Sequence, residues 1–333
     1  MNTNKIAVVI LNWNGKQLLE QFLPTVIAFS KEATIYVADN ASSDESVTFV
    51  KANFTDVKII QNIENGGYAK GYNDALPKVK EELFCLLNSD IEVTENWLAP
   101  MLSEFESNPE TAIIQPKILD FKQKTHFEYA GAAGGFIDKY GYPYCRGRIF
   151  HTLEKDTKQY NDTSEIFWAS GACLFIRKTV FTELNGLDED FFAHQEEIDM
   201  CWRALNLGYK IKYIPKSVVF HVGGATLEST NPKKTYLNFR NSLCMLAKNL
   251  PKGKLFPIIF SRLILDGIAA LQFLIKLQFT HFLAVIKAHF HFYARLPKML
   301  KKRQKTQQKQ YFQHNSIIFS YFVKGKKIYS DLL

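Results

Sequence analysis

The first 120 residues alternate short apolar runs with stretches whose apolar positions recur at helical spacing. The runs that we interpret as strands cover residues 6–11, 34–38, 57–60, 83–87 and 112–119. The helices predicted between them cover residues 15–30, 46–53 and 97–106, because apolar side chains three or four positions apart share one helix face. This alternation predicts an α/β fold with a Rossmann-like, mostly parallel sheet flanked by helices.

Polar side chains follow the apolar run at 83–87, which reads as a strand buried on both faces. The run stops at Asn88, Ser89 and Asp90. Ligands of open α/β sheets bind at the carboxyl ends of the strands, so Asp90 is placed where a metal ion or a phosphate-bearing substrate would bind. The alternative is an ordinary polar turn, since Asn, Ser and Asp are common turn residues.

Two further polar segments follow predicted strands. The cluster at 39–44 is rich in small polar side chains and follows the second strand. After the third strand, Gly66, Gly67 and Gly71 fall within six residues. Glycines permit positive φ angles and close backbone approach, which a phosphate or sugar requires at a helix N-terminus.

The regular pattern breaks between residues 120 and 163, where Gly, Tyr and charged residues dominate. A long irregular insertion is usually functional, so we expect a loop over the site that contacts an acceptor. Order returns with a strand at 166–177, a helix at 178–184 and a strand at 210–214.

An acidic pair, Glu196 and Glu197, lies near the start of another predicted helix, which ends before Gly208. Two interpretations stay open: the pair stabilises the helix start through the dipole, or it supplies a general base in a partly dry cleft. Asp199 and Arg203 are four positions apart and are expected to pair on the helix surface.

A lone histidine, His221, follows the apolar residues 218–220 and precedes two glycines. Such a histidine is most often a hydrogen-bonded structural residue. It could equally complete a metal site with Asp90.

Composition narrows the possibilities. The chain has 333 residues, 47% of them hydrophobic, which is enough to fill a sizeable core. Its five cysteines are scattered and form no CxxC pair, which argues against a disulfide framework or a zinc site and favours a reducing cytosol. The apolar run at 6–11 is too short for a signal peptide and is expected to be the first strand.

Charge is divided unevenly. From Lys248 onward the sequence holds 16 Lys and Arg against Asp266 and Asp331, a net of +14, so the first 247 residues carry −6 of the total of +8. The basic character therefore belongs to the C-terminal region, and a nucleic-acid groove on the main domain is not expected.

The region from 251 to 333 is predicted to be a basic, amphipathic, helical appendage. No charge-free run reaches the roughly 18 residues of a spanning helix, so we expect no membrane crossing. A helix pair lying on an anionic bilayer is favoured, because a basic cluster follows the apolar residues. The cluster comprises Lys298, Lys301, Lys302, Arg303, Lys305 and Lys309. The alternative is a helical unit that packs its apolar face on the catalytic core.

The order of these segments resembles that of the family 2 glycosyltransferases of the GT-A fold, in particular the rhamnosyltransferase-like branch that builds bacterial cell-surface polysaccharides. The resemblance runs from Ile6 to about Leu250. It is carried by residues 9–15 (VILNWNG), 38–44 (ADNASSD), 65–73 (NGGYAKGYN), 87–90 (LNSD) and 196–203 (EEIDMCWR), together with His221, Arg240 and Asn241. It implies a GT-A domain over 1–250, with a nucleotide-binding half at 1–119 and an acceptor half at 120–250.

The resemblance also implies roles for individual residues. Asp39 would read a pyrimidine base, Asp90 would hold Mg²⁺ or Mn²⁺ on the donor diphosphate with His221, and Glu197 or Glu196 would deprotonate the acceptor. The other residues expected at the donor are Asn12, Asn40, Asp44, Gly66, Gly67, Lys70, Gly71, Asn73, Asn88, Ser89 and Arg240. Those expected at the acceptor are Trp168, Gly171 and Ala172.

The implied activity is inverting hexosyl transfer from a nucleotide-diphosphate sugar, dTDP-rhamnose-like or a UDP-sugar, to a surface or lipid-linked glycan. The implied location is the cytoplasmic face of the plasma membrane. The sequence has one carboxylate in the segment 88–90, where the family pattern has two, and Glu-Glu where the family has Glu-Asp. A non-catalytic nucleotide-sugar-binding partner of a glycan assembly complex stays open as the alternative. A nucleotidyltransferase would need a glycine- and lysine-rich N-terminal loop, which the sequence lacks.

Overall fold

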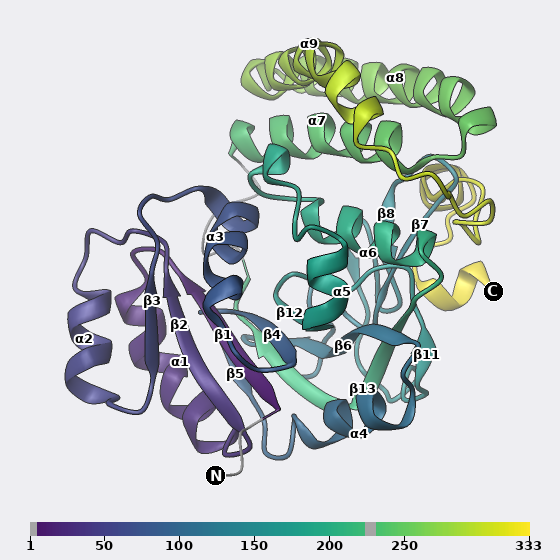
Figure 1. Cartoon of the computed structure of the whole chain (residues 1–333). Coiled ribbons are helices and arrows are strands. Elements are labelled where there is room, and N and C mark those ends of the chain that lie inside the picture. The colour runs from purple at the N-terminus through teal and green to yellow at the C-terminus, as the bar shows by residue number, and fades with distance from the viewer. Residues whose placement is uncertain (1–4, 224–230) are drawn as a thin grey trace.

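A nine-stranded sheet forms the centre of the protein. The structure, a computed structural model, describes residues 5–223 and 231–333. The strands of this sheet are β1 (Ile6–Asn12), β2 (Ala33–Asp39), β3 (Lys58–Gln61), β4 (Leu83–Asn88), β5 (Ile91–Val93), β6 (Thr111–Asp120), β11 (Ser164–Glu165), β12 (Cys173–Arg177) and β13 (Lys210–His221). Their order is β11-β13-β6-β12-β4-β1-β2-β3, with β5 also paired to β13 (Figure 1).

The N-terminal part of the sheet is parallel. Strand β1 pairs in parallel with β2 and β4, and β2 pairs in parallel with β3. Strand β12 runs antiparallel between β4 and β6. Four neighbouring strands therefore end at one edge of the sheet, and the expectation of a mostly parallel α/β fold is confirmed.

Helices cover both faces of the sheet and enclose two apolar layers. They are α1 (Lys16–Ala28), α2 (Ser46–Asn53), α3 (Gly67–Ala75), α4 (Ala99–Ser107), α5 (Lys178–Glu183) and α6 (Glu196–Asn206). One layer is formed with α1, α2 and α4, and the other with α3, α5 and α6. Alternate strand residues enter each layer: Val8 lies in the first and Val9 in the second.

The region predicted as an irregular loop, 120–163, instead forms a second, four-stranded sheet. Its strands are β7 (Gly135–Ile137), β8 (Pro143–Cys145), β9 (Arg148–Ile149) and β10 (Thr152–Leu153). Gly135 is needed because a Cβ there would lie 2.0 Å from the Trp168 ring. Strands of two or three residues leave too few alternating positions for a pattern to be read, which explains the wrong prediction.

The strand predicted at 166–177 was also too long. Only β12 is a strand, since a turn precedes it in which the Cys173 amide donates to the Ser170 carbonyl at 3.2 Å. Gly171 lies within this turn, and the strand begins only after it, at Cys173.

Three long helices follow the sheet domain. They are α7 (Pro232–Asn249), α8 (Lys252–Ile275) and α9 (Phe279–Lys301), and they lie as a layer on one side of the domain (Figure 1). The last 32 residues then return to the second sheet, where the Ile317 amide donates to Asp138 and the Tyr329 amide to Glu154, each at 2.9 Å. The region 251–333 thus contacts the core, but many apolar side chains of α8 and α9 remain exposed, so the alternative of an apolar face packed on the core is not borne out.

Length and composition would allow α8 to cross a membrane, which corrects the expectation that no segment qualifies. That expectation counted only charge-free runs, and α8 contains Arg262 and Asp266. Both side chains are buried, and their Nε and Oδ1 atoms lie 2.9 Å apart.

A buried charge network joins α6 to α7. Asp199 and Arg203, expected on the helix surface, are both buried and pair at 2.7 Å. The Lys248 ammonium lies 2.8 Å from Asp199 and 2.6 Å from Asp188. Burial alone would raise the pKa of Asp199, but Lys248 and Arg203 lower it, so the carboxylate is charged.

Replacing Asp199 with Ala is expected to lower the free energy of unfolding by about 3–5 kcal/mol, because Lys248 and Arg203 would lose their buried counter-charge. Asp74→Ala is the matched control, since its ion pair with Lys70 is partly exposed and is worth at most about 1 kcal/mol. Urea denaturation followed by circular dichroism measures both. Equal losses of unfolding free energy in the two variants would contradict the assignment of a stabilising buried charge network.

Candidate active site

The carboxyl ends of β1 and β2 form the floor of a polar site. Asn12 and Asp39 are buried, and the Asn12 amide donates to Asp39 at 3.3 Å and to Ser42 at 3.2 Å. The Asn12 Oδ1 atom is buried and has no hydrogen-bond partner among the described residues. A side chain on Gly15 would meet this oxygen at 2.5 Å. Because Gly15 has no side chain, space remains beside the Asn12 oxygen for a hydrogen-bond donor of a ligand.

The glycine-rich segment, residues 66–71, lies at the N-terminus of α3. Gly67 has φ +81°, and a Cβ there would lie 2.4 Å from the Phe192 carbonyl. The next amide, of Tyr68, donates to this carbonyl at 2.9 Å. Gly71 instead allows α3 to pack on β1, because a Cβ would lie 2.8 Å from Leu11. The two glycines thus have different roles.

Several residues predicted to bind the donor have structural contacts. Asn40 donates to the Gly67 carbonyl at 3.1 Å, and Asp44 accepts the amides of Lys16 and Ser46 at 3.1 and 3.0 Å. Asn73 binds the backbone of Leu187 through both ends of its amide. Lys70 pairs with Asp74 on the surface of α3. Their roles at the donor stay predictions.

The segment after β4 carries the predicted metal ligand. The carboxylate of Asp90 and the imidazole of His221 are buried, and Asp90 Oδ1 lies 3.2 Å from His221 Nε2. On the far side of the ring, Glu128 Oε1 lies 3.2 Å from Nδ1. Burial alone would lower the pKa of His221, but Glu128 and Asp90 raise it to about 10. The structure thus brings Asp90 and His221 together, as expected.

Glu128 was missed by the sequence analysis. It lies in the stretch predicted as an irregular loop, and no local pattern marks it. Its second oxygen accepts the Ala130 amide at 2.6 Å, which fixes the carboxylate beside the ring. Across residues 5–223 and 231–333, no group of three His, Cys, Asp or Glu side chains is placed to hold a metal ion on its own.

The backbone before the acidic pair is strained. Phe192, His194 and Gln195 have φ angles of +66°, +69° and +74°, which side chains other than glycine rarely adopt. The Asn241 amide of α7 donates to the carbonyls of Phe191, Ala193 and His194 at 2.8–3.0 Å. This asparagine therefore holds the strained loop in place.

Arg240, predicted at the donor, also contacts this loop. Its guanidinium is buried and donates to the carbonyls of Asp190 and Phe191 at 3.0 and 2.9 Å. The contact positions the loop, and a direct role at the donor stays a prediction.

The strained loop delivers Glu196 and Glu197 to the first turn of α6. Glu196 is buried, and its Oε2 has no hydrogen-bond partner among residues whose positions are described. Burial, followed by the charge of Glu197, raises the pKa of Glu196 well above its usual range. Burial also raises the pKa of Glu197 to about 7, and this side chain is partly exposed. Burial thus favours the neutral form of Glu196, while Glu197 exchanges its proton near neutrality.

Contacts connect the acidic pair to the strand ends. Burial raises the pKa of Tyr68 well above its usual range, and the charges of Tyr72, Glu196 and Glu197 raise it further. The Tyr68 hydroxyl donates to the Gly171 carbonyl at 2.7 Å, and the Ala172 carbonyl accepts the Asn88 amide at 3.0 Å. Gly171 and Ala172 therefore lie between the two halves of the site.

Trp168, predicted at the acceptor, is placed elsewhere. Its ring is buried in the core, and the indole N–H donates to the Phe136 carbonyl at 2.9 Å. Trp168 therefore packs against the second sheet. This corrects the prediction that it contacts the acceptor.

The comparisons with known proteins agree with this geometry. Residues 7–184 match the model of the family "Glycosyl transferase family 2", which is more than half of the chain. An N-acetylglucosaminyl-diphospho-decaprenol L-rhamnosyltransferase of Mycobacterium tuberculosis is 22% identical over 66% of this chain and 76% of its own length. The low-salt glycan biosynthesis hexosyltransferase Agl10 of Haloferax volcanii is 25% identical over 71% of this chain and 73% of its own length.

A solved structure of GalNAc-T7 with UDP, GalNAc and Mn²⁺ shares the fold, with a TM-score of 0.58 and 18% identity. The match covers 75% of this chain and 49% of that one. The GT-A fold expected from the sequence is thus confirmed. The chain belongs to glycosyl transferase family 2 and is a glycosyltransferase.

Proposed function

We propose that this enzyme transfers a hexosyl group, with inversion, from a nucleotide-diphosphate sugar to a hydroxyl of a cell-surface polysaccharide or lipid-linked glycan. The observation that carries the proposal is the partly exposed Glu197, whose pKa of about 7 suits a general base. The rhamnosyltransferase relative supports a rhamnose-like donor, and the UDP in the GalNAc-T7 structure supports a UDP-sugar as the other candidate.

The reaction follows from the placement of the residues. The acceptor oxygen attacks the anomeric carbon, its proton passes to Glu197, and the electron pair of the sugar–phosphate bond goes to the diphosphate. Direct displacement on the face opposite the leaving group inverts the anomeric centre. Glu196 retains its own proton and hydrogen-bonding capacity.

Unpaired polar atoms support an acceptor site at the strained loop. His194 Nε2, Gln195 Oε1 and Glu196 Oε2 are buried and have no hydrogen-bond partner in the described part of the chain. Buried polar atoms are normally satisfied, so three on consecutive residues indicate a polar ligand. Sugar hydroxyls both donate and accept, and would satisfy all three.

Asp90 and His221 fit a divalent cation, Mg²⁺ or Mn²⁺, which would take the place of the Nε2 proton that His221 shares with Asp90. Two protein ligands suffice when diphosphate oxygens and water complete the coordination shell, as is usual for Mg²⁺. The bound ion would supply positive charge to the leaving diphosphate. Glu128 would keep the His221 ring oriented with Nε2 toward the ion. The Mn²⁺ in the GalNAc-T7 structure supports this assignment.

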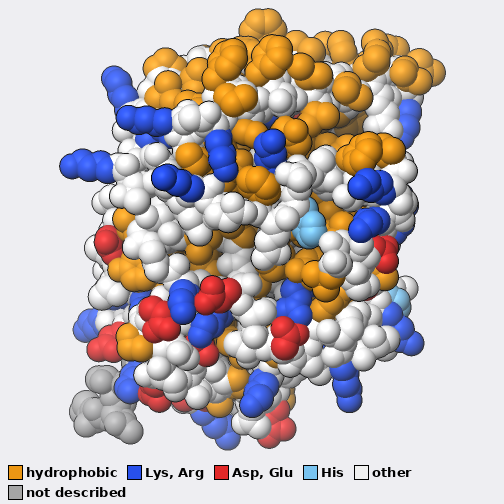
Figure 2. Space-filling model, turned by 90° about the vertical axis from the view of Figure 1, so that its right-hand side faces the viewer, with side chains coloured by type: hydrophobic (Ala, Val, Ile, Leu, Met, Phe, Trp, Pro, Cys, Tyr) orange, Lys and Arg blue, Asp and Glu red, His pale blue; other side chains and the backbone are white. Residues whose placement is uncertain are grey.

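We also propose that the enzyme works at the cytoplasmic face of the plasma membrane. An apolar face, formed by residues of α8 and α9 that are each more than half exposed, covers one end of the molecule (Figure 2). Its residues are Phe256, Phe260, Ile264, Ile268, Leu271, Ile275, Phe279, Leu283, Phe290 and Tyr293. An area of this kind on a soluble surface indicates an interaction site.

Charge favours an anionic bilayer as the occupant of the apolar face. From Lys248 to Ser330 the sequence contains one acidic residue, Asp266, which is buried against Arg262. Lys252, Lys276 and Lys301 are exposed on the same helices or at their ends. Because the Arg262–Asp266 pair lies on the opposite side of α8, the helix is expected to lie on the membrane.

The basic cluster after α9 contributes less to this contact than the sequence suggested. Lys298 and Lys302 pair with Asp190 at 2.6 Å, and Lys302 also pairs with Asp188. Arg303 donates to the carbonyls of Ala247 and Leu250. These three side chains tie α9 to the core.

Glu197→Gln is expected to lower kcat by about 10²–10⁴-fold, the usual contribution of a general base, with little change in donor affinity. Glu196→Gln is the matched control, because the amide mimics a carboxyl group that is already neutral. In the wild-type enzyme the transfer rate should rise with pH through about 7 as Glu197 loses its proton. Full transfer by Glu197→Gln would instead favour the non-catalytic alternative or a base elsewhere.

Asp90→Asn is expected to abolish the extra thermal stabilisation that Mn²⁺ gives to the complex with a nucleoside diphosphate. A ligand at a hundred times its dissociation constant adds about 2.7 kcal/mol in the wild type. The control Asp74→Asn removes a surface carboxylate and should retain the full shift. A metal-dependent shift that persists in Asp90→Asn would refute the assigned ligand.

Ile268→Glu is expected to weaken binding to phosphatidylglycerol vesicles by at least about tenfold, since burying an isoleucine is worth about 1.5–3 kcal/mol. The control Ile63→Glu makes the same change at a fully exposed position outside the apolar face. Vesicle sedimentation measures both. Unchanged vesicle binding by Ile268→Glu, with a change from dimer to monomer, would show that a second copy of the chain covers the face.

A further inference from the structure

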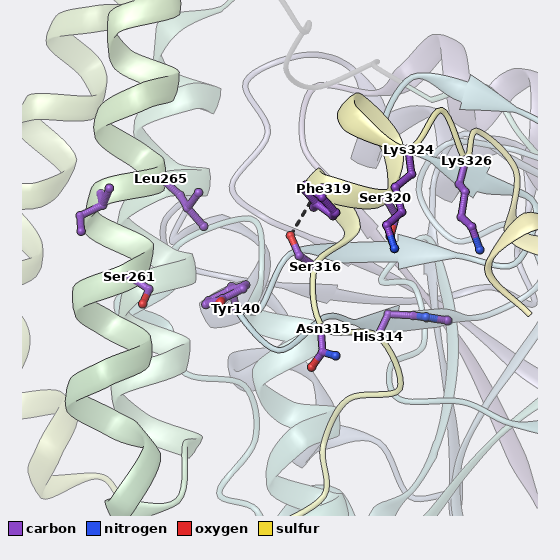
Figure 3. Close-up of a pocket in the computed structure, with 11 residues that line it drawn as sticks. Tyr140, Ser261, Leu265, His314, Asn315, Ser316, Phe319, Ser320, Lys324 and Lys326 are labelled. Atoms are coloured by element: carbon purple, nitrogen blue, oxygen red, sulfur yellow. Dashed lines mark hydrogen bonds between the residues drawn. The ribbon is translucent and has the colours of Figure 1, made fainter.

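A pocket of about 670 Å³ lies between α8 and the C-terminal tail. Figure 3 shows side chains of α8, including Ser261 and Leu265, on one side and the tail side chains on the other, with Tyr140 between them. The pocket is separate from the transferase site, since none of its lining residues belongs to the strand ends or the acidic pair.

The two sides of the pocket differ in chemistry. The α8 side is apolar and includes Ile264 and Leu265. The tail side offers hydrogen-bonding groups and positive charge from His314, Ser316, Ser320, Lys324 and Lys326. Such a lining matches a ligand with a polar, anionic end and a hydrocarbon end.

The positive charge is unopposed. No Asp or Glu occurs among the described lining residues, and neither the Lys324 nor the Lys326 ammonium has a carboxylate partner in the described ranges. The pKa of His314 is lowered, first by burial and then by the charge of Lys326, so the histidine is neutral and can accept or donate. His314, Lys324 and Lys326 all line the tail side of the pocket, and together they suit a phosphate.

The pocket is continuous with the apolar face. Ile264 belongs to both, and its side chain is 51% exposed. A hydrocarbon chain that leaves the pocket at Ile264 would pass directly onto the exposed stripe of α8. A free phosphate would use only the basic side of the pocket.

Contacts with the rest of the protein fix the C-terminal tail, residues 302–333, beside the pocket. Tyr311 donates to the Lys139 carbonyl at 2.7 Å, the Lys139 amide donates to the His314 carbonyl at 3.0 Å, and Ile317 is fully buried. Ser320 lies in η3 (Phe319–Val323), a short π-helical turn.

We propose that this pocket binds the phosphate head group of a single lipid, with the lipid chain lying along the apolar face of α8. The inference rests on the proposed membrane contact and adds to it a specific lipid site. It predicts that the lipid binds as a monomer, without a bilayer and without a sugar donor.

Calorimetric titration of the full chain with monomeric dihexanoyl phosphatidic acid tests the proposal. Lys324→Ala/Lys326→Ala should weaken binding roughly 30-fold, the expected effect of removing two lysine contacts from an anionic head group. Lys305→Ala/Lys309→Ala is the matched control, because it removes the same charge from exposed positions of the same tail that do not line the pocket. The affinity of this control variant for the lipid should equal that of the wild type.

Equal weakening in both pairs would overturn the proposal in favour of diffuse attraction to a basic tail. Inorganic phosphate binding as tightly as the lipid would also overturn it, because the site would then be one for free phosphate. Ser320→Trp, which fills the pocket without changing charge, should block binding, and tight binding by this variant would refute the location. Since no donor or transfer enters the assay, failure here leaves the proposed transferase chemistry standing.

Discussion

The geometry of the site depends on one side-chain amide. Asn241 binds three carbonyls of a loop in which three residues occupy the left-handed region. Each such residue costs roughly 1–3 kcal/mol, so the loop would relax without a support from outside. The loop sets the direction of Glu196 and Glu197. The acidic pair therefore owes its position to α7, a helix far along the chain.

The parallel strands provide the other half of the site. Because β1, β2 and β4 end at one edge, Asn12, Asp39 and the segment 88–90 come together without long loops. Gly67 then brings the start of α3 against the strained loop. The sheet thus contacts the strained loop, and the strand ends and the acidic pair are fixed relative to each other.

Much of the N-terminal half of the fold could be predicted from the sequence. Parallel strands buried on both faces leave continuous apolar runs, and polar residues at their ends mark the binding edge, so Asp90 and His221 could be expected together. The second sheet could not be predicted, because its short strands show no periodicity. Glu128 lies 93 positions before His221, and Asp199 lies 49 positions before Lys248. Local pattern carries no information on such distant contacts. Trp168 shows the converse error, since the resemblance implied that it lies at the acceptor, whereas its ring is buried in the core.

The buried pair of Arg262 and Asp266 has a geometric consequence for the whole molecule. Tyr142 donates to Asp266 and Arg262 donates to the Tyr140 carbonyl, so the pair anchors α8 to the second sheet. The helix cannot turn about its axis without separating these groups. This anchoring fixes the apolar face relative to the sheet domain. Under the proposed function, an acceptor held at that face would reach Glu197 only if its own length matched the distance between them.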